Sequence, residues 1–253
     1  MTHLRGLLPV VKTIKNWPTH VLDYLNLVPP GKVLYRLRNG VKIKARAKTL
    51  DNMVIREVWI YDEYIPKGFE FPQDATVVDV GGHIGCFALK ASRTAPNGKV
   101  YVFEPSPENF PLLQENIQFN SASNITPFNL ALLGHPGTRQ IALCPNKVSN
   151  SIVFDYPTAQ RVDVQGISLS DFIRQHNIQQ IDFMKLDCEG AEYEIFFECP
   201  DEVLSRIKKI SAEVHELDEK RNPKTLANFL ESKVFQLVND PTKPHMLYAR
   251  SPV

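Results

Sequence analysis

From residue 74 onward, short apolar runs alternate with amphipathic helical stretches, and this alternation restricts the fold more than any other feature of the chain. Seven apolar runs predict strands at residues 76–80, 99–103, 125–131, 181–186, 207–214, 235–238 and 246–250. The helical stretches lie at 84–91, 110–120, 170–176 and 223–230, a pattern typical of strand–helix–strand units in a parallel sheet. Seven strands are too few for a barrel of eight such units. The predicted fold class is therefore α/β, with a doubly wound, mostly parallel seven-stranded sheet.

Residues 1–72 have a different character. A helical segment is expected over 10–27; Pro29-Pro30-Gly31 then breaks the pattern, and a short β region follows. We predict an N-terminal helical and β-hairpin extension over 1–72 and an α/β domain over 73–253. In that domain, the long stretch 133–180 is expected to hold a further hairpin before its short helix.

The β region of the extension predicts a bulged hairpin. A two-residue loop would scramble its two faces, whereas a three-residue loop ending at a left-handed Gly40 pairs Leu37 with Val41 and Tyr35 with Ile43. The other face is basic, with Arg36, Arg38, Lys42, Lys44, Arg46 and Lys48. This face is either a solvated face that protects the sheet edge or a surface for an anionic partner.

The overall charge argues against a nucleic-acid-binding protein. Lysine and arginine number 29 and aspartate and glutamate 28, so the formal net charge is only +1. A chain that grips nucleic acid phosphates non-specifically normally carries a clear basic excess.

The cysteines and the apolar runs suggest the compartment. The four cysteines stand far apart without a C-x-x-C pair, which favours reduced thiols in the cytosol over a disulfide scaffold. The apolar run 7–11 contains Pro9 and is too short for a signal peptide. No uncharged apolar run reaches about 18 residues, so we expect no membrane span and a cytoplasmic protein.

The strongest local motif follows the first strand of the α/β domain: Asp79, Gly81, Gly82, His83 and Gly85 lie where a parallel sheet binds ligands. The glycine spacing does not match the dinucleotide fingerprint, and no Lys-Ser/Thr pair follows, so a phosphate-cradling NTPase loop is excluded. The spacing Asp-x-Gly-x-x-x-Gly resembles motif I of class I S-adenosylmethionine-dependent methyltransferases. That resemblance implies cofactor contacts at all five residues, the alternative being a purely structural turn.

An acid, Glu104, ends the second strand of the domain. A carboxylate at this position can accept hydrogen bonds from both ribose hydroxyls of a nucleoside. This feature alone supports adenosine binding without choosing between S-adenosylmethionine and a dinucleotide.

The most specific motif lies at the end of the 181–186 strand, where Lys185, Asp187, Glu189 and Glu192 follow one another at short spacing. This run closely resembles the Lys-x-Asp-x-Glu-Gly-x-Glu hallmark of the FkbM family of methyltransferases. Segments 103–105, 167–172, 213–215 and 38–57 look like the same family, so the resemblance covers roughly residues 33–216.

The residues near this motif suggest the chemistry. Asp187 and His215 are candidates for the base that takes a hydroxyl proton, and Glu189 is a third catalytic candidate. Purely structural roles are the alternative: His215 would be a residue that hydrogen-bonds within the fold, and Glu192 an acid that stabilises a helix N-terminus. Ser151 lies in a polar loop that we place near the cofactor, although a plain turn is equally consistent.

The acids and the histidine could instead hold Mg²⁺; we assign no metal ligand. The resemblance implies an S-adenosylmethionine-dependent O-methyltransferase that acts on a hydroxyl of a small molecule, sugar or polyketide-like acceptor. Two alternatives stay open: a methyltransferase for RNA or another macromolecule that uses the basic hairpin, and a non-catalytic nucleoside-binding protein.

Overall fold

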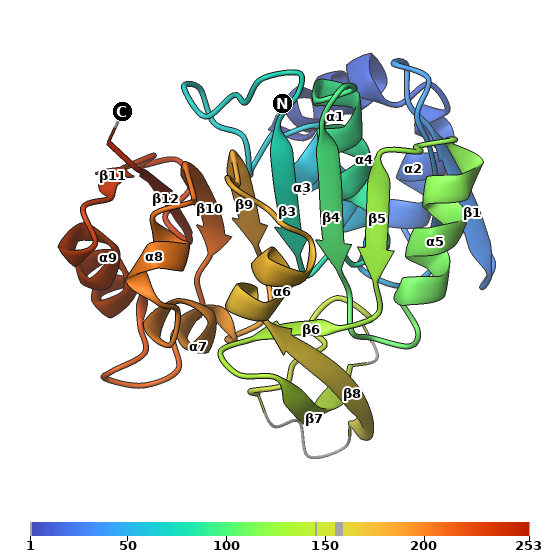
Figure 1. The fold of residues 1–253 in the computed structure, drawn as a ribbon. Helices are drawn as coiled ribbons and strands as arrows, with labels where there is room; N and C mark the ends of the chain where they lie inside the picture. Colours follow the sequence, from blue (N-terminus) through green and yellow to red (C-terminus); the bar gives the residue numbers. More distant parts are fainter. Residues whose placement is uncertain (1, 145, 155–158, 253) are drawn as a thin grey trace.

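A central sheet of seven strands organises the computed structural model, which describes residues 2–144, 146–154 and 159–252. The strand order is β11-β12-β10-β9-β3-β4-β5, and β12 alone runs antiparallel to its neighbours (Figure 1). The strands are β3 (Thr76–Val80), β4 (Lys99–Phe103), β5 (Ile125–Phe128), β9 (Phe183–Leu186), β10 (Lys209–Glu213), β11 (Gln236–Val238) and β12 (Met246–Arg250). This arrangement confirms the predicted fold class.

Helices cover both faces of the sheet because the strand residues alternate between two hydrophobic clusters. In β3, Val77 belongs to one cluster and Val78 to the other; in β4, Val100 and Tyr101 divide in the same way. The helices of this part of the chain are α4 (Cys86–Thr94), α5 (Phe110–Phe119), α6 (Leu169–Gln175), α7 (Glu192–Phe197), α8 (Asp201–Leu204) and α9 (Pro223–Ser232). The helices α4 and α5 pack on the first cluster, and α6 to α9 on the second.

A second, three-stranded sheet lies beyond the carboxyl ends of β3, β4 and β9 (Figure 1). It consists of β6 (Ala131–Leu133), β7 (Gly137–Leu143) and β8 (Gln160–Ser168). The antiparallel pair β7–β8 confirms the predicted hairpin, although residues 155–158 of its connection lie outside the described residues. The predicted strand 125–131 is corrected: it divides into β5 and β6, because Asn129 turns the chain by donating to the carbonyls of Glu104 (2.9 Å) and Pro105 (3.2 Å).

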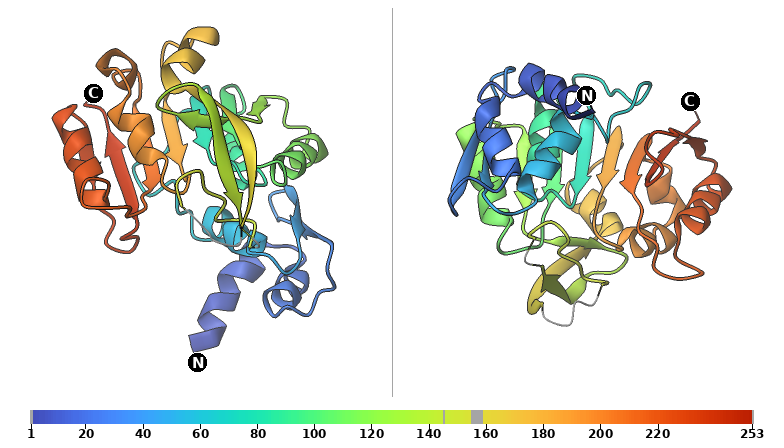
Figure 2. Two further views of the ribbon diagram at one scale, coloured as in Figure 1. Left: turned by 90° about the horizontal axis from the view of Figure 1, so that it is seen from below. Right: turned by 180° about the vertical axis from the view of Figure 1, so that it is seen from behind.

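The N-terminal segment packs on the face that carries α4 (Figure 2). It comprises α1 (Thr2–Thr13), α2 (Trp17–Tyr24), β1 (Lys32–Arg36), β2 (Lys42–Arg46) and α3 (Asp51–Trp59). The single helical segment expected over 10–27 is corrected to two helices. Ile14 bridges to Leu37 of the hairpin, and Pro18 stands in the first turn of the second helix, where proline is favoured. No helix in the described part of the chain is long and apolar enough to cross a membrane.

The hairpin forms with the predicted register: Tyr35 pairs with Ile43, the amide of Leu37 donates to the carbonyl of Val41, and Gly40 has φ +92°. Its basic face has contacts within the fold. Lys32 and Lys44 both form ion pairs with Glu115 of α5, each at 2.5 Å. The free edge of β2 bonds to asparagine side chains of α5, so this edge is closed by the molecule itself.

Candidate active site

A pocket that is partly open to solvent lies between α3, the small sheet and the carboxyl ends of β3, β4 and β9. In open parallel sheets this edge is where ligands bind. Its apolar wall consists of Val54, Val58, Val80, Phe87, Phe103, Ala131, Leu132, Ile141, Val148 and Ile152. Its polar lining includes Tyr64, His83, Glu104, Asn109, Asn150, Lys185, Asp187 and Glu189.

The loop after β3 lines this pocket with two glycines, so its backbone is not covered by side chains there. Gly81 has φ +78°, and a Cβ built there would lie 1.8 Å from the carbonyl oxygen of Asp187. A Cβ on Gly82 would lie 2.1 Å from Val102 Cγ2. The amides of both glycines donate to the carbonyl of Phe103, at 3.0 and 2.9 Å. Any larger residue would displace the loop, so these glycines form a cradle at the pocket floor.

Glu104 is buried at the end of β4 and is held by backbone donors. One carboxylate oxygen accepts from the amide of His83 (2.7 Å) and the other from the amide of Ser106 (2.9 Å). Burial raises the pKa of Glu104. The oxygen bonded to Ser106 also accepts a long hydrogen bond from the side-chain amide of Asn109 (3.5 Å), whereas the oxygen bonded to His83 keeps a further lone pair with which it can accept a hydrogen bond from a ligand in the pocket.

Lys185 joins the acid of β3 to the acid at the end of β9. Its ammonium lies 3.2 Å from Asp79 Oδ1 and 3.8 Å from Asp187 Oδ2, and it donates to the carbonyl of Gly81 at 2.7 Å. Burial acts to lower the pKa of Lys185, but the two carboxylates outweigh it and raise that pKa. Neither carboxylate oxygen of Asp79 has a hydrogen-bond partner among the described residues, so Lys185 is its principal counterion.

Asp187 stands at the tip of β9, where its carboxylate faces the pocket. Its Oδ2 accepts a hydrogen bond of 2.7 Å from the hydroxyl of Tyr64, which lies 123 positions earlier in the chain. Burial, with Asp187 nearby, raises the pKa of Tyr64 far above its usual range. The hydroxyl therefore stays protonated and donates the hydrogen bond to Asp187. The tyrosine therefore fixes the orientation of Asp187.

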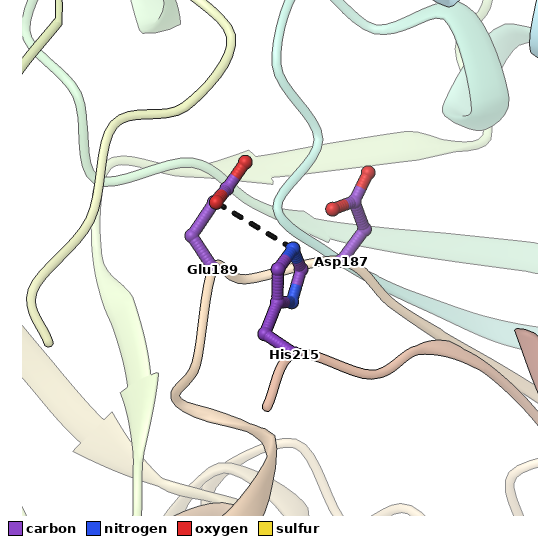
Figure 3. A group of neighbouring side chains, drawn as sticks. All are labelled: Asp187, Glu189 and His215. Atoms are coloured by element: carbon purple, nitrogen blue, oxygen red, sulfur yellow. Dashed lines mark ion pairs between the residues drawn. The ribbon is translucent and has the colours of Figure 1, made fainter. Parts of the chain in front are cut away.

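Glu189 and His215 lie beside Asp187 (Figure 3). His215 Nε2 is 3.5 Å from Glu189 Oε2, and its Nδ1 is 3.2 Å from the fully buried Glu192. Asp187, Glu189 and His215 each offer one ligand atom, and these atoms lie within 4.8 Å of one another. Two carboxylates and an imidazole held by a further carboxylate are donors able to bind a divalent cation.

Several acids around this cluster have raised pKa values. Burial, together with Asp187, raises the pKa of Glu189 to about 7 and that of Glu213 to about 8, and burial with Glu63 and Asp187 raises the pKa of Glu57 to about 7. Burial acts to lower the pKa of His215, but Glu192, Glu189 and Asp187 outweigh it and raise that pKa to about 9. At neutral pH His215 therefore carries a proton.

The structure brings together most of the residues predicted from the motifs. Those that line the pocket are Gly81, Gly82, His83, Glu104, Asp187 and Glu189. Four others are not among the lining residues: Asp79, Gly85, Ser151 and His215. The Ser151 hydroxyl donates to the carbonyl of Glu189 (2.7 Å) and accepts from the amides of Val153 and Phe154, which is the pattern of a local turn. Its assignment as a cofactor contact stays a prediction.

Sequence reasoning missed three contributors to the site. Tyr64 lies in a segment without periodicity, and no sequence signal places it near Asp187. The helix α3, which supplies Val54 and Val58 to the wall, was not predicted either. The role of Lys185 did have a signal: a lysine in an otherwise apolar buried strand requires a counterion, and the register pairs it with Asp79.

The sheet order and the pocket over the glycine loop define a class I methyltransferase fold. The crystal structure of methyltransferase FkbM from Methylobacillus flagellatus KT has the same fold, with a TM-score of 0.52 and 18% identity over 74% of this chain and 46% of that chain. The family model of the methyltransferase FkbM domain matches residues 79–237. The chain belongs to this methyltransferase family.

Two relatives illustrate the range of the family. The chain is 28% identical over 185 residues to Methyltransferase 1 of Beauveria bassiana (strain ARSEF 2860), covering 65% of this chain and 74% of that protein. It is 25% identical over 214 residues to the 31-O-demethyl-FK506 methyltransferase FkbM of Streptomyces tacrolimicus, covering 72% of this chain and 82% of that protein.

Proposed function

We propose that the protein transfers a methyl group from S-adenosylmethionine to a hydroxyl oxygen of a small molecule, sugar or polyketide-like acceptor. One observation carries the proposal: a single pocket is lined by a bare glycine loop, a buried acid after β4 and an acid at the tip of β9. The relative from Streptomyces tacrolimicus, whose name specifies O-methylation, supports oxygen as the acceptor atom.

The residues present fit the proposed cofactor. Gly81 and Gly82 line the pocket without side chains, so a ligand can approach the backbone of this loop closely. Glu104 would accept hydrogen bonds from the ribose hydroxyls, and the apolar wall at Ile141 and Ile152 would cover a flat base. When bound, the cofactor supplies an electrophilic methyl group on a sulfonium centre.

The chain contributes a proton acceptor at Asp187. Its carboxylate lies in the pocket and is oriented by Tyr64 and Lys185, so it would bind the acceptor hydroxyl and take its proton as the oxygen becomes nucleophilic. Much of the rate would come from holding the acceptor oxygen in position. His215 is protonated at neutral pH and is therefore the weaker of the two base candidates.

The test compares two substitutions at opposite ends of the pocket. Asp187→Ala should lower methyl transfer to an acceptor found by screening by roughly 100-fold or more, with S-adenosylhomocysteine affinity within about threefold of wild type. Glu104→Ala should instead weaken S-adenosylhomocysteine binding. Full turnover by Asp187→Ala would show that Asp187 is not the base.

A further inference from the structure

An ion pair in the N-terminal segment reaches the glycine loop. Asp51, the first residue of α3, is completely buried. The guanidinium of Arg46, at the end of β2, binds Asp51 in a bidentate manner: Nε donates to Oδ2 at 3.0 Å and Nη2 to Oδ1 at 2.9 Å. The amide of Arg46 also donates to Oδ2, at 2.8 Å. Both residues precede position 79, where the family model begins to match.

The pair meets the imidazole of His83. His83 Nε2 lies 3.2 Å from Asp51 Oδ1 and 3.2 Å from Arg46 Nη2. His83 has φ +49°, an unusual backbone conformation for a residue other than glycine. Burial acts to raise the pKa of Asp51, but His83 and Arg46 outweigh it and hold that pKa below its usual range.

His83 in turn contacts both the proposed ribose-binding acid and the pocket. Its amide donates to Glu104 Oε2 at 2.7 Å, and its side chain lines the pocket. The Nδ1 atom of His83 is buried and has no hydrogen-bond partner among the described residues. A buried polar atom beside an open pocket is the kind of group that a ligand satisfies.

We propose that Arg46 and Asp51 are positioning residues of the cofactor site, acting through His83. The ion pair clamps the imidazole, which keeps the His83 backbone left-handed and its amide directed at Glu104. This inference rests on the proposed function, because it assumes that the pocket binds S-adenosylmethionine. It assigns to the N-terminal segment a part in cofactor binding that the glycine motif alone does not reveal.

The experiment measures S-adenosylhomocysteine binding by calorimetry to the full chain carrying Asp51→Asn. This change keeps the side chain's size but removes the charge that pairs with Arg46 and His83. We expect the dissociation constant to rise at least tenfold. The matched control is Asp62→Asn, which removes the charge of an exposed acid of the same segment that pairs with Lys90 of α4 at 2.6 Å, and it should leave the constant unchanged.

A double-mutant cycle separates positioning from general stability. His83→Asn removes the imidazole but keeps a residue that tolerates the left-handed backbone. If Asp51 acts through His83, adding Asp51→Asn to His83→Asn should weaken binding by less than twofold. Should Asp51→Asn fail to fold, Arg46→Gln removes the other partner of the ion pair and should also weaken binding at least tenfold.

Three results are decisive. Wild-type affinity in Asp51→Asn, or in Arg46→Gln, would overturn the inference. Equal losses from Asp51→Asn with and without His83→Asn would also overturn it, because Asp51 would then act by another route. Failure of the folded wild-type protein to bind S-adenosylhomocysteine would instead overturn the proposed function.

Discussion

Gly81 shows how closely the backbone of the loop after β3 approaches its neighbours. Its φ of +78° is a conformation that glycine adopts without strain. A methyl group in place of its Cα hydrogen would overlap the carbonyl oxygen of Asp187. Because that carbonyl belongs to Asp187, directly after β9, a displaced loop would also disturb the acids at the end of this strand. At the residue scale, glycine therefore links the cofactor side of the pocket to the catalytic side.

Gly81→Ala should destabilise the protein by roughly 3 kcal/mol or more, since the clash adds to the cost of a left-handed alanine. Gly68→Ala is the control, because Gly68 has φ +88° and a Cβ there would meet nothing within 4 Å. It should cost only about 1 kcal/mol. Urea denaturation measures both, and equal losses would show that the clash is relieved without cost.

The helix α5 ties the N-terminal hairpin to the sheet through asparagine side chains. Asn116 is fully buried; its amide group accepts from the backbone N–H of Lys44 (2.8 Å) and donates to the carbonyls of Lys44 and Ile84, both at 2.9 Å. Asn120 bonds in the same way to the backbone of Lys42, in a partly exposed position. At the element scale, these side chains replace a neighbouring strand at the edge of β2.

Asn116→Ala should lower the free energy of unfolding by roughly 3 kcal/mol, because it removes a fully buried side chain and leaves the carbonyl of Ile84 and both backbone groups of Lys44 without their partner. Asn120→Ala should cost about 1 kcal/mol, since water can replace its bonds. Chemical denaturation of the two variants checks this difference. A smaller loss for Asn116→Ala than for Asn120→Ala would contradict the bridging role.

The elements were predictable where local pattern and turn chemistry agree. The alternation around Gly40 predicted the hairpin register, and the periodic runs predicted the seven strands. The helix α3 was not predicted: its apolar residues are divided between the core, which takes Ile55 and Val58, and the pocket, which Val54 and Val58 line. The acids of the site were found through local motifs, whereas the contact of Tyr64 with Asp187 depends on the tertiary fold.

At the scale of the whole molecule, charge is distributed unevenly. The formal net charge is +1, yet burial and the nearby charge of Asp187 raise the pKa values of three acids beside the pocket, Glu57, Glu189 and Glu213. Acidic and basic groups are thus concentrated at the pocket, where Lys185 and the protonated His215 stand among these carboxyl groups, a concentration that the total charge does not show.

The cluster also predicts how stability depends on pH. The pKa of Glu213 is raised to about 8, so the folded protein binds this proton more tightly than the unfolded chain does. Its contribution is fully present below about pH 4.5 and is lost as the pH rises through 8. Glu213→Gln, which mimics the protonated acid, should therefore match wild type near pH 4.5 and exceed it by on the order of 2 kcal/mol at pH 9. Thermal unfolding across this range tests the sign; a variant less stable than wild type at pH 9 would contradict it.

The central claim, a pocket built for S-adenosylmethionine, is tested most directly by calorimetric titration of the purified protein with S-adenosylhomocysteine, using NADH as the control ligand. The account predicts saturable one-to-one binding of S-adenosylhomocysteine, no binding of NADH, and loss of binding in Glu104→Ala. A folded wild-type protein that binds NADH but not S-adenosylhomocysteine would contradict the claim.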